Sequence, residues 1–336
     1  MRALILSAGL GTRLKPLTEV LPKPMLPLLN RPILEHTLEL LNRNGIQDIA
    51  VNLHHLPNKI TSHFGSALQY FHEEEILGTA GAIRNCSDFI QGESFVIING
   101  DIVSDINLKQ VLKFHREKKS QVTLVVYQTK NMEQYQPIEI DPNGKIVRFP
   151  HSRLSQTVEG AKRVIFTGAQ IIEPEFLGLI PPNRFCGTTD KIYPAMLNKN
   201  LPIYGYLHQG YWKDMGNRKN YLMANKDGLD GKVKLTTSGQ LNPKIQNIMP
   251  PVLIGKNCIL SPYSQIGPYV VLGDNCRIEE GALIENSICW NNVFVGTGAV
   301  VRDSVLGQNI IVPPKQTFFH RIGVQKGFKP KLGKLD

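Results

Sequence analysis

The sequence predicts an α/β domain built on a mostly parallel sheet, followed by a parallel β-helix of hexapeptide repeats. Up to about residue 228, short β-rich runs alternate with helical patterns. Alternation at this spacing is typical of βαβ units. From about residue 246, aliphatic residues recur every six positions. That period fits neither a helix nor a plain strand, but it fits the faces of a triangular coil.

In the first part of the chain, the expected strands and helices follow one another at short intervals. Strands are expected at 2–7, 48–53, 94–100 and 121–127, and helices at 32–45, 79–90, 107–119 and 217–226. The run Ser94-Phe95-Val96-Ile97-Ile98 is almost wholly apolar, as expected of a central strand that is covered on both faces. Asp141-Pro142-Asn143-Gly144 predicts a turn between two extended runs.

The second part carries the six-residue repeat. Its aliphatic positions are Ile248, Ile254, Leu260, Ile266, Leu272, Ile278 and Ile284. The phase then slips by one residue and continues at Val295 and Val301. We therefore expect a first domain at 1–230, a linker at 231–245, a β-helix at 246–314 and a basic tail at 315–336.

Composition excludes several classes of protein. The 336 residues are enough for roughly two domains, and 42% hydrophobic residues exclude bulk disorder. No apolar run reaches the ~18 residues of a membrane span, and the N-terminal run lacks the features of a signal peptide. Five scattered cysteines without a CxxC pair indicate a reducing compartment, so we expect a cytoplasmic protein. The net charge of +10 suits phosphorylated small molecules. No motif for nucleic acid or a membrane accompanies it.

A glycine-rich segment follows the first expected strand: Ser7-Ala8-Gly9-Leu10-Gly11-Thr12-Arg13-Leu14. Such a turn can present backbone N–H groups to an anion, and the fork of Arg13 suits phosphate oxygens. The segment is neither a Walker A loop nor GxGxxG, and on its own it fits a plain tight turn as well. Lys23 stands between Pro22 and Pro24, which stiffen its loop; it is either a phosphate contact or a surface lysine.

Together these residues resemble a known signature. Residues 6–28, LSAGLGTRLKPLTEVLPKPMLPL, are similar to the signature of the sugar-1-phosphate nucleotidyltransferases, also called nucleotide-sugar pyrophosphorylases. Residues 75–82 resemble the base-recognition loop of that family, 99–101 its metal-binding strand end, and 212–216 its W-x-D-x-G segment. The repeats resemble those of mannose-1-phosphate guanylyltransferases. The resemblance implies a Rossmann-like catalytic domain and a left-handed β-helix.

The implied reaction is attack of a sugar 1-phosphate on the α-phosphorus of an NTP, with release of pyrophosphate. By resemblance, Asp101 and Asp214 hold Mg²⁺, a hard cation that prefers carboxylate and phosphate oxygens. Arg13 should neutralise the departing pyrophosphate, and Lys23 should contact the α-phosphate or the incoming phosphate. The attacking phosphate is already ionised, so no side-chain base is needed. Catalysis then consists of positioning and charge neutralisation.

The resemblance also proposes the binding residues. Nucleotide contacts are expected from Leu6, Ala8, Gly9, Gly11, Thr12, Arg13, Gly78, Thr79, Gly81 and Gly100. Sugar contacts are expected from Glu139, Arg148, Arg153, Thr167, Gly168 and Asp190. The sugar side departs from the family pattern, because residues 146–153 lack the Glu-Lys-Pro segment of many members.

Several functions remain open at this level. Our first choice of substrates is GTP and mannose 1-phosphate; the alternatives are uridylyl or thymidylyl transfer to another sugar 1-phosphate, such as glucose 1-phosphate, and a non-catalytic paralogue that senses nucleotide sugars. Acyl transfer in the β-helix would need a coil-borne histidine, and His320 lies beyond the repeats. A β-helix leaves faces to be covered, so a homo-oligomer is expected.

Overall fold

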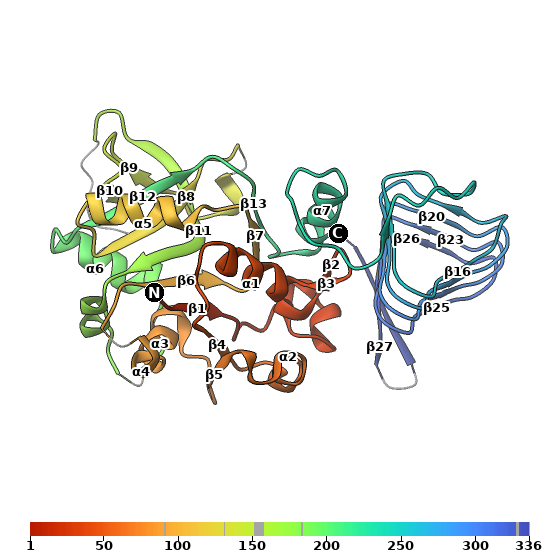
Figure 1. Ribbon diagram of the computed structural model, residues 1–336, viewed down its shortest axis with the longest axis horizontal. Coiled ribbons are helices and arrows are strands. Elements are labelled where there is room, and N and C mark those ends of the chain that lie inside the picture. The colour runs from red at the N-terminus through yellow and green to blue at the C-terminus, as the bar shows by residue number, and fades with distance from the viewer. Residues whose placement is uncertain (91, 131, 151–157, 183, 327–328, 336) are drawn as a thin grey trace. The chain divides into compact units, whose positions relative to one another are not determined.

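The computed structural model describes residues 1–90, 92–130, 132–150, 158–182, 184–326 and 329–335 (Figure 1). The chain forms two compact units, whose limits differ from the domains expected from sequence order. The first unit comprises Met1–Gly9 and Thr37–Trp212, and the second comprises Leu10–His36 and Lys213–Asp336. The boundary falls inside the glycine-rich segment. Residues 10–36 therefore belong with the C-terminal part of the chain.

The first unit is built on a mixed sheet in the strand order β10-β9-β11-β6-β1-β4-β5, with β8 beside β11 and β12 beside β8. The neighbours β6, β1, β4 and β5 are parallel, whereas β11 runs antiparallel to β6, β8 and β9. The expected α/β sheet is thus confirmed, with β11 as an antiparallel strand inside it. Its strands are β1 (Ala3–Leu6), β4 (Ile49–Leu53), β5 (Gln69–His72), β6 (Phe95–Asn99), β8 (Val122–Tyr127), β9 (Ile138–Ile140), β10 (Ile146–Arg148), β11 (Lys162–Ile172) and β12 (Ile203–His208).

Helices cover both faces of this sheet. Helices α3 (Gly78–Asn85), α4 (Ser87–Ile90) and α6 (Tyr193–Asn198) share an apolar cluster with Leu4, Ile97 and Leu124 of the strands. Helix α5 (Leu108–Glu117) packs on β8 from the other side, where Thr123 bonds to His115. Neighbouring strand residues point to opposite faces, so a sheet covered on both sides needs continuous apolar runs.

All eight strands and helices that the sequence predicted in this part are present, with boundaries that shift by at most three residues. The expected helix at 79–90 is divided into α3 and α4, with Cys86 between them. The turn at 141–144 is confirmed, because the Asp141 carboxylate accepts hydrogen bonds from the backbone of Asn143 and Lys145. The sequence analysis missed α2 (Pro57–Phe64) and β5. Further elements in this part of the chain include α1 (Ile33–Arg43), β7 (Ile102–Ser104) and β13 (Trp212–Asp214).

In the second unit, helix α7 (Arg218–Leu229) makes hydrogen bonds to residues 10–36 and to the β-helix. The hairpin of β2 (Pro27–Leu28) and β3 (Arg31–Pro32) lies against α7, since the Tyr221 hydroxyl donates to Pro27 O. The indole of Trp290 in the β-helix donates to the same hydroxyl at 3.1 Å. Three short helical turns, η1 (Thr12–Leu14), η2 (Leu17–Glu19) and η3 (Lys23–Met25), precede the hairpin.

The repeats form a coil with three parallel sheets, seen in Figure 1 as stacked short arrows. The sheets are β15-β18-β21-β24-β27, β16-β19-β22-β25 and β17-β20-β23-β26, and the repeated aliphatic residues fill the interior. The strands are β14 (Gln240–Leu241), β15 (Val252–Ile254), β16 (Ile259–Leu260), β17 (Gln265–Ile266), β18 (Val270–Leu272), β19 (Arg277–Ile278), β20 (Leu283–Glu285), β21 (Ile288–Cys289), β22 (Phe294–Val295), β23 (Val300–Arg302), β24 (Val305–Leu306), β25 (Ile311–Val312), β26 (Thr317–Phe319), β27 (Arg321–Lys326) and β28 (Lys329–Lys334).

The strand register explains the phase slip in the repeat. Ile254 pairs with Leu272, 18 residues further on, whereas Leu272 pairs with Cys289 and Cys289 with Leu306, each 17 residues further on. One corner of each later coil is one residue shorter than in the first coil. The slip noticed once in the sequence therefore recurs in every later coil.

The coil continues beyond residue 314. Strand β26 pairs with β23, β27 pairs with β24, and β28 returns antiparallel to β27. The segment expected as a basic tail thus contributes a last turn and a hairpin. Within the described ranges, no helix has both the length and the apolarity needed to cross a bilayer.

Candidate active site

The predicted residues fall into two groups, one in each unit. In the first unit, the carboxyl ends of the parallel neighbours β1 and β6 lie side by side, with Leu6 paired to Asn99. The backbone of Gly100 donates to Leu6 O at 2.9 Å, and a Cβ at position 100 would collide with the Ser7 hydroxyl. A larger residue here would therefore require the Ser7 hydroxyl to move. Asp101 follows, half-buried, at the sheet edge where α/β folds bind ligands.

Strand β11 brings Gly168 to the same edge. Gly168 has φ +88°, and a Cβ there would lie 2.6 Å from Nδ2 of Asn99. The neighbouring Thr167 is buried, and its hydroxyl donates to Val125 O within the sheet. Of the residues predicted to bind sugar, Gly168 thus lies beside the strand end that precedes Asp101, while the Thr167 hydroxyl is engaged by the backbone.

The other predicted sugar contacts are dispersed. Glu139 and Arg148 face each other on β9 and β10 and form an ion pair of 3.4 Å. The exposed Asp190 lies against Gly187. Arg153 lies outside the described residues. The sugar contacts stay a prediction.

The predicted base-recognition loop is packed against residues 184–188. Cys186 O accepts hydrogen bonds from the backbone of Ala80 and Gly81 at 2.9 and 3.1 Å, and a Cβ on Gly78 would lie 2.6 Å from the same oxygen. The Thr79 hydroxyl accepts from Thr188 N at 2.8 Å. Close packing on the protein backbone accounts for both glycines, and their contact with a nucleotide stays a prediction.

A buried polar chain joins this loop to the end of β1. The Asn52 side-chain oxygen accepts from Ser7 N at 2.6 Å, and its amide donates to Oε1 of Glu73 at 2.6 Å. Oε2 of Glu73 accepts from Leu77 N at 3.0 Å. Asn52 and Glu73 are only 3% and 5% exposed, so water cannot replace these partners.

In the second unit, three of the predicted catalytic residues are placed by the glycines that lie near them. Gly11 has φ +60°, and a Cβ there would lie 3.4 Å from Cβ of Lys23. Thr12 and Arg13 are exposed. A Cβ on Gly216 would lie 3.1 Å from Nη2 of Arg13 and would collide with the Asp214 carboxylate. Arg13 and Asp214 are thus both close to Gly216, and Lys23 lies beside Gly11.

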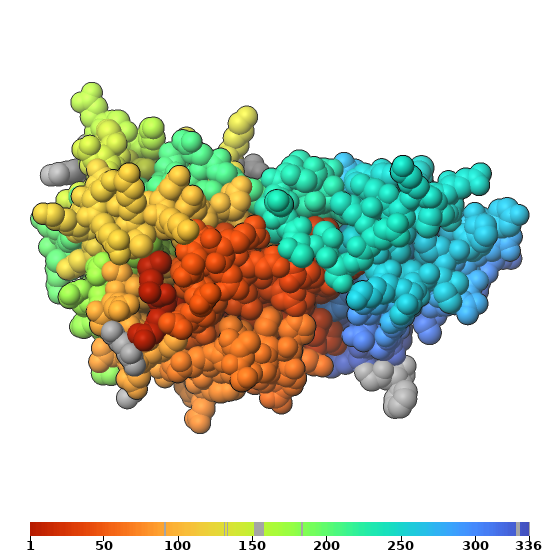
Figure 2. Space-filling model, viewed as in Figure 1, coloured from red at the N-terminus to blue at the C-terminus, as the bar shows by residue number. Residues whose placement is uncertain are grey.

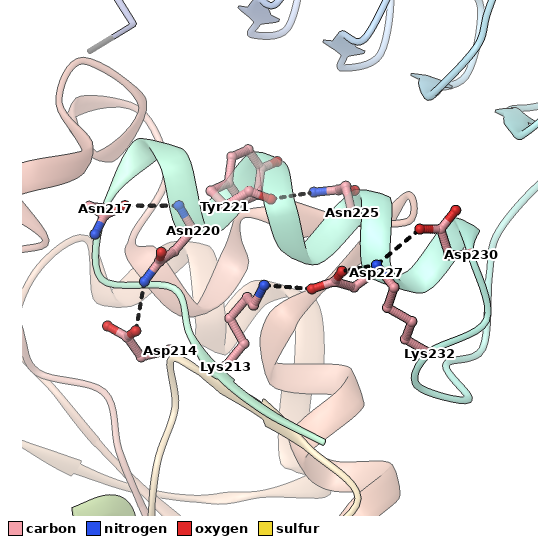
Figure 3. A network of polar contacts seen from close by, with 9 residues as sticks. All are labelled: Lys213, Asp214, Asn217, Asn220, Tyr221, Asn225, Asp227, Asp230 and Lys232. Carbon is pink, nitrogen blue, oxygen red and sulfur yellow. Dashed lines mark hydrogen bonds and ion pairs between the residues drawn. The ribbon is translucent and has the colours of Figure 1, made fainter. Parts of the chain in front are cut away.

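Figure 3 shows how α7 holds Asp214. The Asn220 amide donates to Oδ1 of Asp214 at 2.7 Å, and Gly216 N donates to Oδ2 at 3.1 Å. Asn217 caps the helix by accepting from Asn220 N at 2.8 Å. Asn220 is therefore fixed at the first turn of α7, with its amide directed at the carboxylate.

A second carboxylate anchors the residue before Asp214. Asp227, 4% exposed, lies between the ammonium groups of Lys213 at 2.5 Å and Lys232 at 2.9 Å (Figure 3). Hydrogen bonds to Asp227 and Asp230 raise the pKa of Lys232. A buried carboxylate is stable only when it is paired in this way, so the end of β13 is tied to the body of α7.

The comparisons with known proteins identify the family of the chain. A family model described as Nucleotidyl transferase matches residues 2–231. The chain belongs to the nucleotidyl transferase family. A second model, described as GMPPB C-terminal domain, matches residues 248–316 of this nucleotidyl transferase.

Relatives of this nucleotidyl transferase match over most of their length. A UTP–glucose-1-phosphate uridylyltransferase of Synechocystis is 31% identical, over 91% of this chain and 87% of its own. A mannose-1-phosphate guanylyltransferase of Mycobacterium tuberculosis is 29% identical, over 89% and 82%. The solved structure of HddC from Yersinia pseudotuberculosis shares the fold, with a TM-score of 0.57 and 24% identity, over 68% of this chain and 99% of its own.

The carboxylates predicted to bind metal in this nucleotidyl transferase suit a hard cation that takes its other ligands from substrate and water. Asp101 and Asp214 are half-buried and offer carboxylate oxygens. Among the described residues, no three histidine, cysteine or acidic side chains are grouped as a metal cage. Mg²⁺ is commonly bound through one or two carboxylates, with substrate phosphates and water completing the shell. Carboxylates of this kind therefore suit Mg²⁺ in the presence of a phosphorylated substrate, and the binding of one ion by both stays a prediction.

Sequence reasoning missed the residues that hold this machinery in place. Asn52, Glu73, Asn220 and Asp227 belong to no motif that the sequence analysis singled out. Asn52 interrupts an otherwise apolar strand, which is the one local signal of a buried polar role. Its partners come from β1 and from the segment after β5, and only the fold brings these together.

Proposed function

We propose that this nucleotidyl transferase transfers a nucleotidyl group from an NTP to a sugar 1-phosphate and releases pyrophosphate. The arrangement around the glycine-rich segment carries this proposal: Lys23 lies beside Gly11, and Arg13 and Asp214 lie close to Gly216. Two polyanions must approach each other in this reaction. Exposed main chain and fixed cations are the groups that reduce their repulsion.

The side chains act by charge and position. Arg13 offers planar N–H donors to the leaving pyrophosphate, and the backbone of residues 9–13 offers further donors. Lys23, held between two prolines, supplies a point charge to the phosphate at which substitution occurs. The sugar phosphate is already an anion, so the protein needs only to align it.

Asp101 and Asp214 would hold the metal ion. Bound Mg²⁺ would neutralise phosphate charge and order the phosphate oxygens. Asn220 and the backbone of Gly216 hold both oxygens of Asp214 in place. Removal of Mg²⁺ should abolish turnover while leaving the fold intact, as checked by circular dichroism in EDTA.

We propose GTP and mannose 1-phosphate as the substrates. The match of residues 248–316 to the GMPPB C-terminal domain supports this choice, as do relatives named mannose-1-phosphate guanylyltransferase. The alternative is UTP with glucose 1-phosphate, favoured by the 31% identity to the Synechocystis uridylyltransferase.

The deciding experiment combines the protein with Mg²⁺, each NTP and a panel of sugar 1-phosphates, and measures released pyrophosphate. We expect release with GTP and mannose 1-phosphate to exceed all other pairs. Faster release with UTP and glucose 1-phosphate would select the alternative. Absence of release from every pair, together with tight binding of a nucleotide sugar, would identify a sensing paralogue.

Variants test the assigned roles. Lys23→Ala and Asp101→Ala should lower kcat by about a hundredfold or more, because charge stabilisation is lost mainly in the transition state. Neither change should alter the melting temperature by more than a few degrees, since both side chains are partly exposed. Lys59→Ala, an exposed lysine of α2, is the matched control. A near-normal kcat in either variant would reject its role.

We further propose that the protein works as a homo-oligomer in the cytoplasm. All five cysteines are free thiols, as expected in a reducing compartment. Figure 2 shows the surface of the coil in cyan and blue. Ile259 and Ile311 are each 62% exposed on the outside of the coil. They occupy equivalent positions on neighbouring strands of one sheet, in the order Ile259, Arg277, Phe294, Ile311. Light scattering of the protein and of Ile311→Lys should show a concentration-dependent oligomer that the variant weakens. A tagged copy in cells tests the location.

A further inference from the structure

The chain Ser7–Asn52–Glu73–Leu77 links two segments that are distant in sequence. At one end, Ser7 N begins the glycine-rich segment directly after β1. At the other end, Leu77 N lies immediately before α3, in the predicted base-recognition loop. Both terminal donors are backbone N–H groups. The hydrogen bonds therefore fix the main-chain positions of both segments, whatever side chains these segments carry.

The geometry allows one hydrogen-bonding pattern. Ser7 N and Leu77 N are obligatory donors, so the outer atoms of the Asn52–Glu73 pair must both be acceptors. Asn52 then presents its NH2 group to Glu73, and Glu73 accepts with both oxygens. Three bonds of 2.6 to 3.0 Å are made in this order. Because the pair is buried, a lost bond would leave a polar group without water.

We propose that Glu73 is a positioning residue, which acts through Asn52 to hold the glycine-rich segment and the base-recognition loop at the separation that NTP binding requires. This inference rests on the proposed function, since both segments are expected to contact the nucleotide. Glu73 itself touches neither phosphate nor base. It therefore affects the affinity for the NTP rather than the affinity for the sugar 1-phosphate.

The test exchanges the charge within the pair. In Glu73→Gln, the new NH2 group must face another donor, either Leu77 N or the Asn52 NH2 group, so one hydrogen bond is lost. In Asn52→Asp, two carboxylates face each other, and the bond between residues 52 and 73 is lost. In the double variant N52D/E73Q, the aspartate accepts from Ser7 N and from the glutamine NH2, and the glutamine oxygen accepts from Leu77 N. All three hydrogen bonds are restored with the charge on the other residue.

The expected readout is a split between the two substrates. Each single variant should raise KM for the NTP about tenfold, the effect of one lost buried hydrogen bond, with KM for the sugar 1-phosphate changed less than about twofold. The double variant should recover most of the affinity for the NTP. Glu74→Gln, an exposed neighbour, is the matched control and should behave as the wild type.

Hydrogen exchange gives a second readout that needs no activity. The backbone amides of Ser7 and Leu77 should exchange faster in both single variants and regain protection in N52D/E73Q. If the wild type is active, two results would overturn the inference and leave the proposed function in place. One is an equal rise of both KM values in the single variants, and the other is no recovery in the double variant. A wild type without activity would reject the proposed function. Unchanged hydrogen exchange at Ser7 and Leu77 in the single variants would separately reject the role of Glu73 and Asn52 in holding these two segments.

Discussion

The side-chain amide of Asn220 donates a hydrogen bond of 2.7 Å to Oδ1 of Asp214. If Asp214 binds Mg²⁺ as proposed, its carboxylate is already oriented before the ion arrives. Residues behind the ligands of a metal site typically contribute about 10- to 100-fold in metal affinity or activity. Asn220→Ala should therefore lower kcat by about that factor and raise the Mg²⁺ concentration needed for half-maximal rate.

The neighbouring Asn217 provides the control for this prediction. Its side chain caps α7 through the backbone of Asn220, so Asn217→Ala should cost about 1 kcal/mol of stability and should raise the Mg²⁺ requirement much less than Asn220→Ala does. Titration of Mg²⁺ against the rate of pyrophosphate release distinguishes the two. An Asn220→Ala enzyme with the wild-type Mg²⁺ requirement would contradict a role of Asn220 in metal binding.

Asp227 should be more important for stability than its neighbour Asp230. Removal of the buried partner leaves Lys213 without this carboxylate, so Asp227→Ala should lower the free energy of unfolding by about 3 kcal/mol. Asp230 pairs with the exposed end of Lys232, and Asp230→Ala should cost less than about 1 kcal/mol. Urea denaturation measures both. Equal costs would mean that burial of the Asp227 pair has little energetic weight.

Gly100 should not tolerate alanine. The added Cβ would collide with the Ser7 hydroxyl and lie 3.2 Å from Leu6 O, at the strand ends next to Asp101. Gly100→Ala should therefore destabilise the protein by about 1–3 kcal/mol and reduce kcat. Adding Ser7→Gly removes the hydroxyl and should recover part of the stability, as thermal unfolding would show. No recovery would place the strain at the backbone of Leu6 instead.

Acid should weaken the first unit through His115. Burial lowers the pKa of this histidine from its ordinary value of 6.5, and its bond to Glu173 opposes the shift only partly. As the pH falls below 6.5, the unfolded chain takes up this proton before the folded protein does, so stability decreases until the pH passes the folded pKa. The urea midpoint should fall less between about pH 7.5 and about pH 5.5 in His115→Gln than in the wild type. An identical fall would assign the acid sensitivity to other groups.

The sequence predicted the repeating parts of this fold better than its connections. The period of six residues follows directly from the coil geometry, so the β-helix could be predicted from the seven aliphatic residues between Ile248 and Ile284. The strand β5 and the antiparallel direction of β11 could not, because they depend on pairing with distant strands. Residues 10–36 join the C-terminal half through bonds such as that of Leu29 N to Asn225, for which no local pattern exists.

The candidate site shows the same difference. Gly11, Arg13, Lys23 and Asp214 lie in short motifs. Within the second unit, Lys23 lies beside Gly11, and Arg13 and Asp214 both lie close to Gly216. The residues that orient them are ordinary polar side chains, and their role comes from burial and from the partner that they meet. A single sequence contains neither piece of information.

The shortened corner also determines how the coil can change in length. Because Leu272, Cys289 and Leu306 occupy equivalent inward positions at intervals of 17 residues, whole coils are interchangeable units of that size. Excision of residues 289–305 would join Ile288 to Leu306 and keep the later inward-facing side chains, such as Val312, in the interior. Loss of one residue more would turn the rest of the strand inside out. Relatives with longer or shorter stacks should therefore differ from this protein in steps of a complete coil.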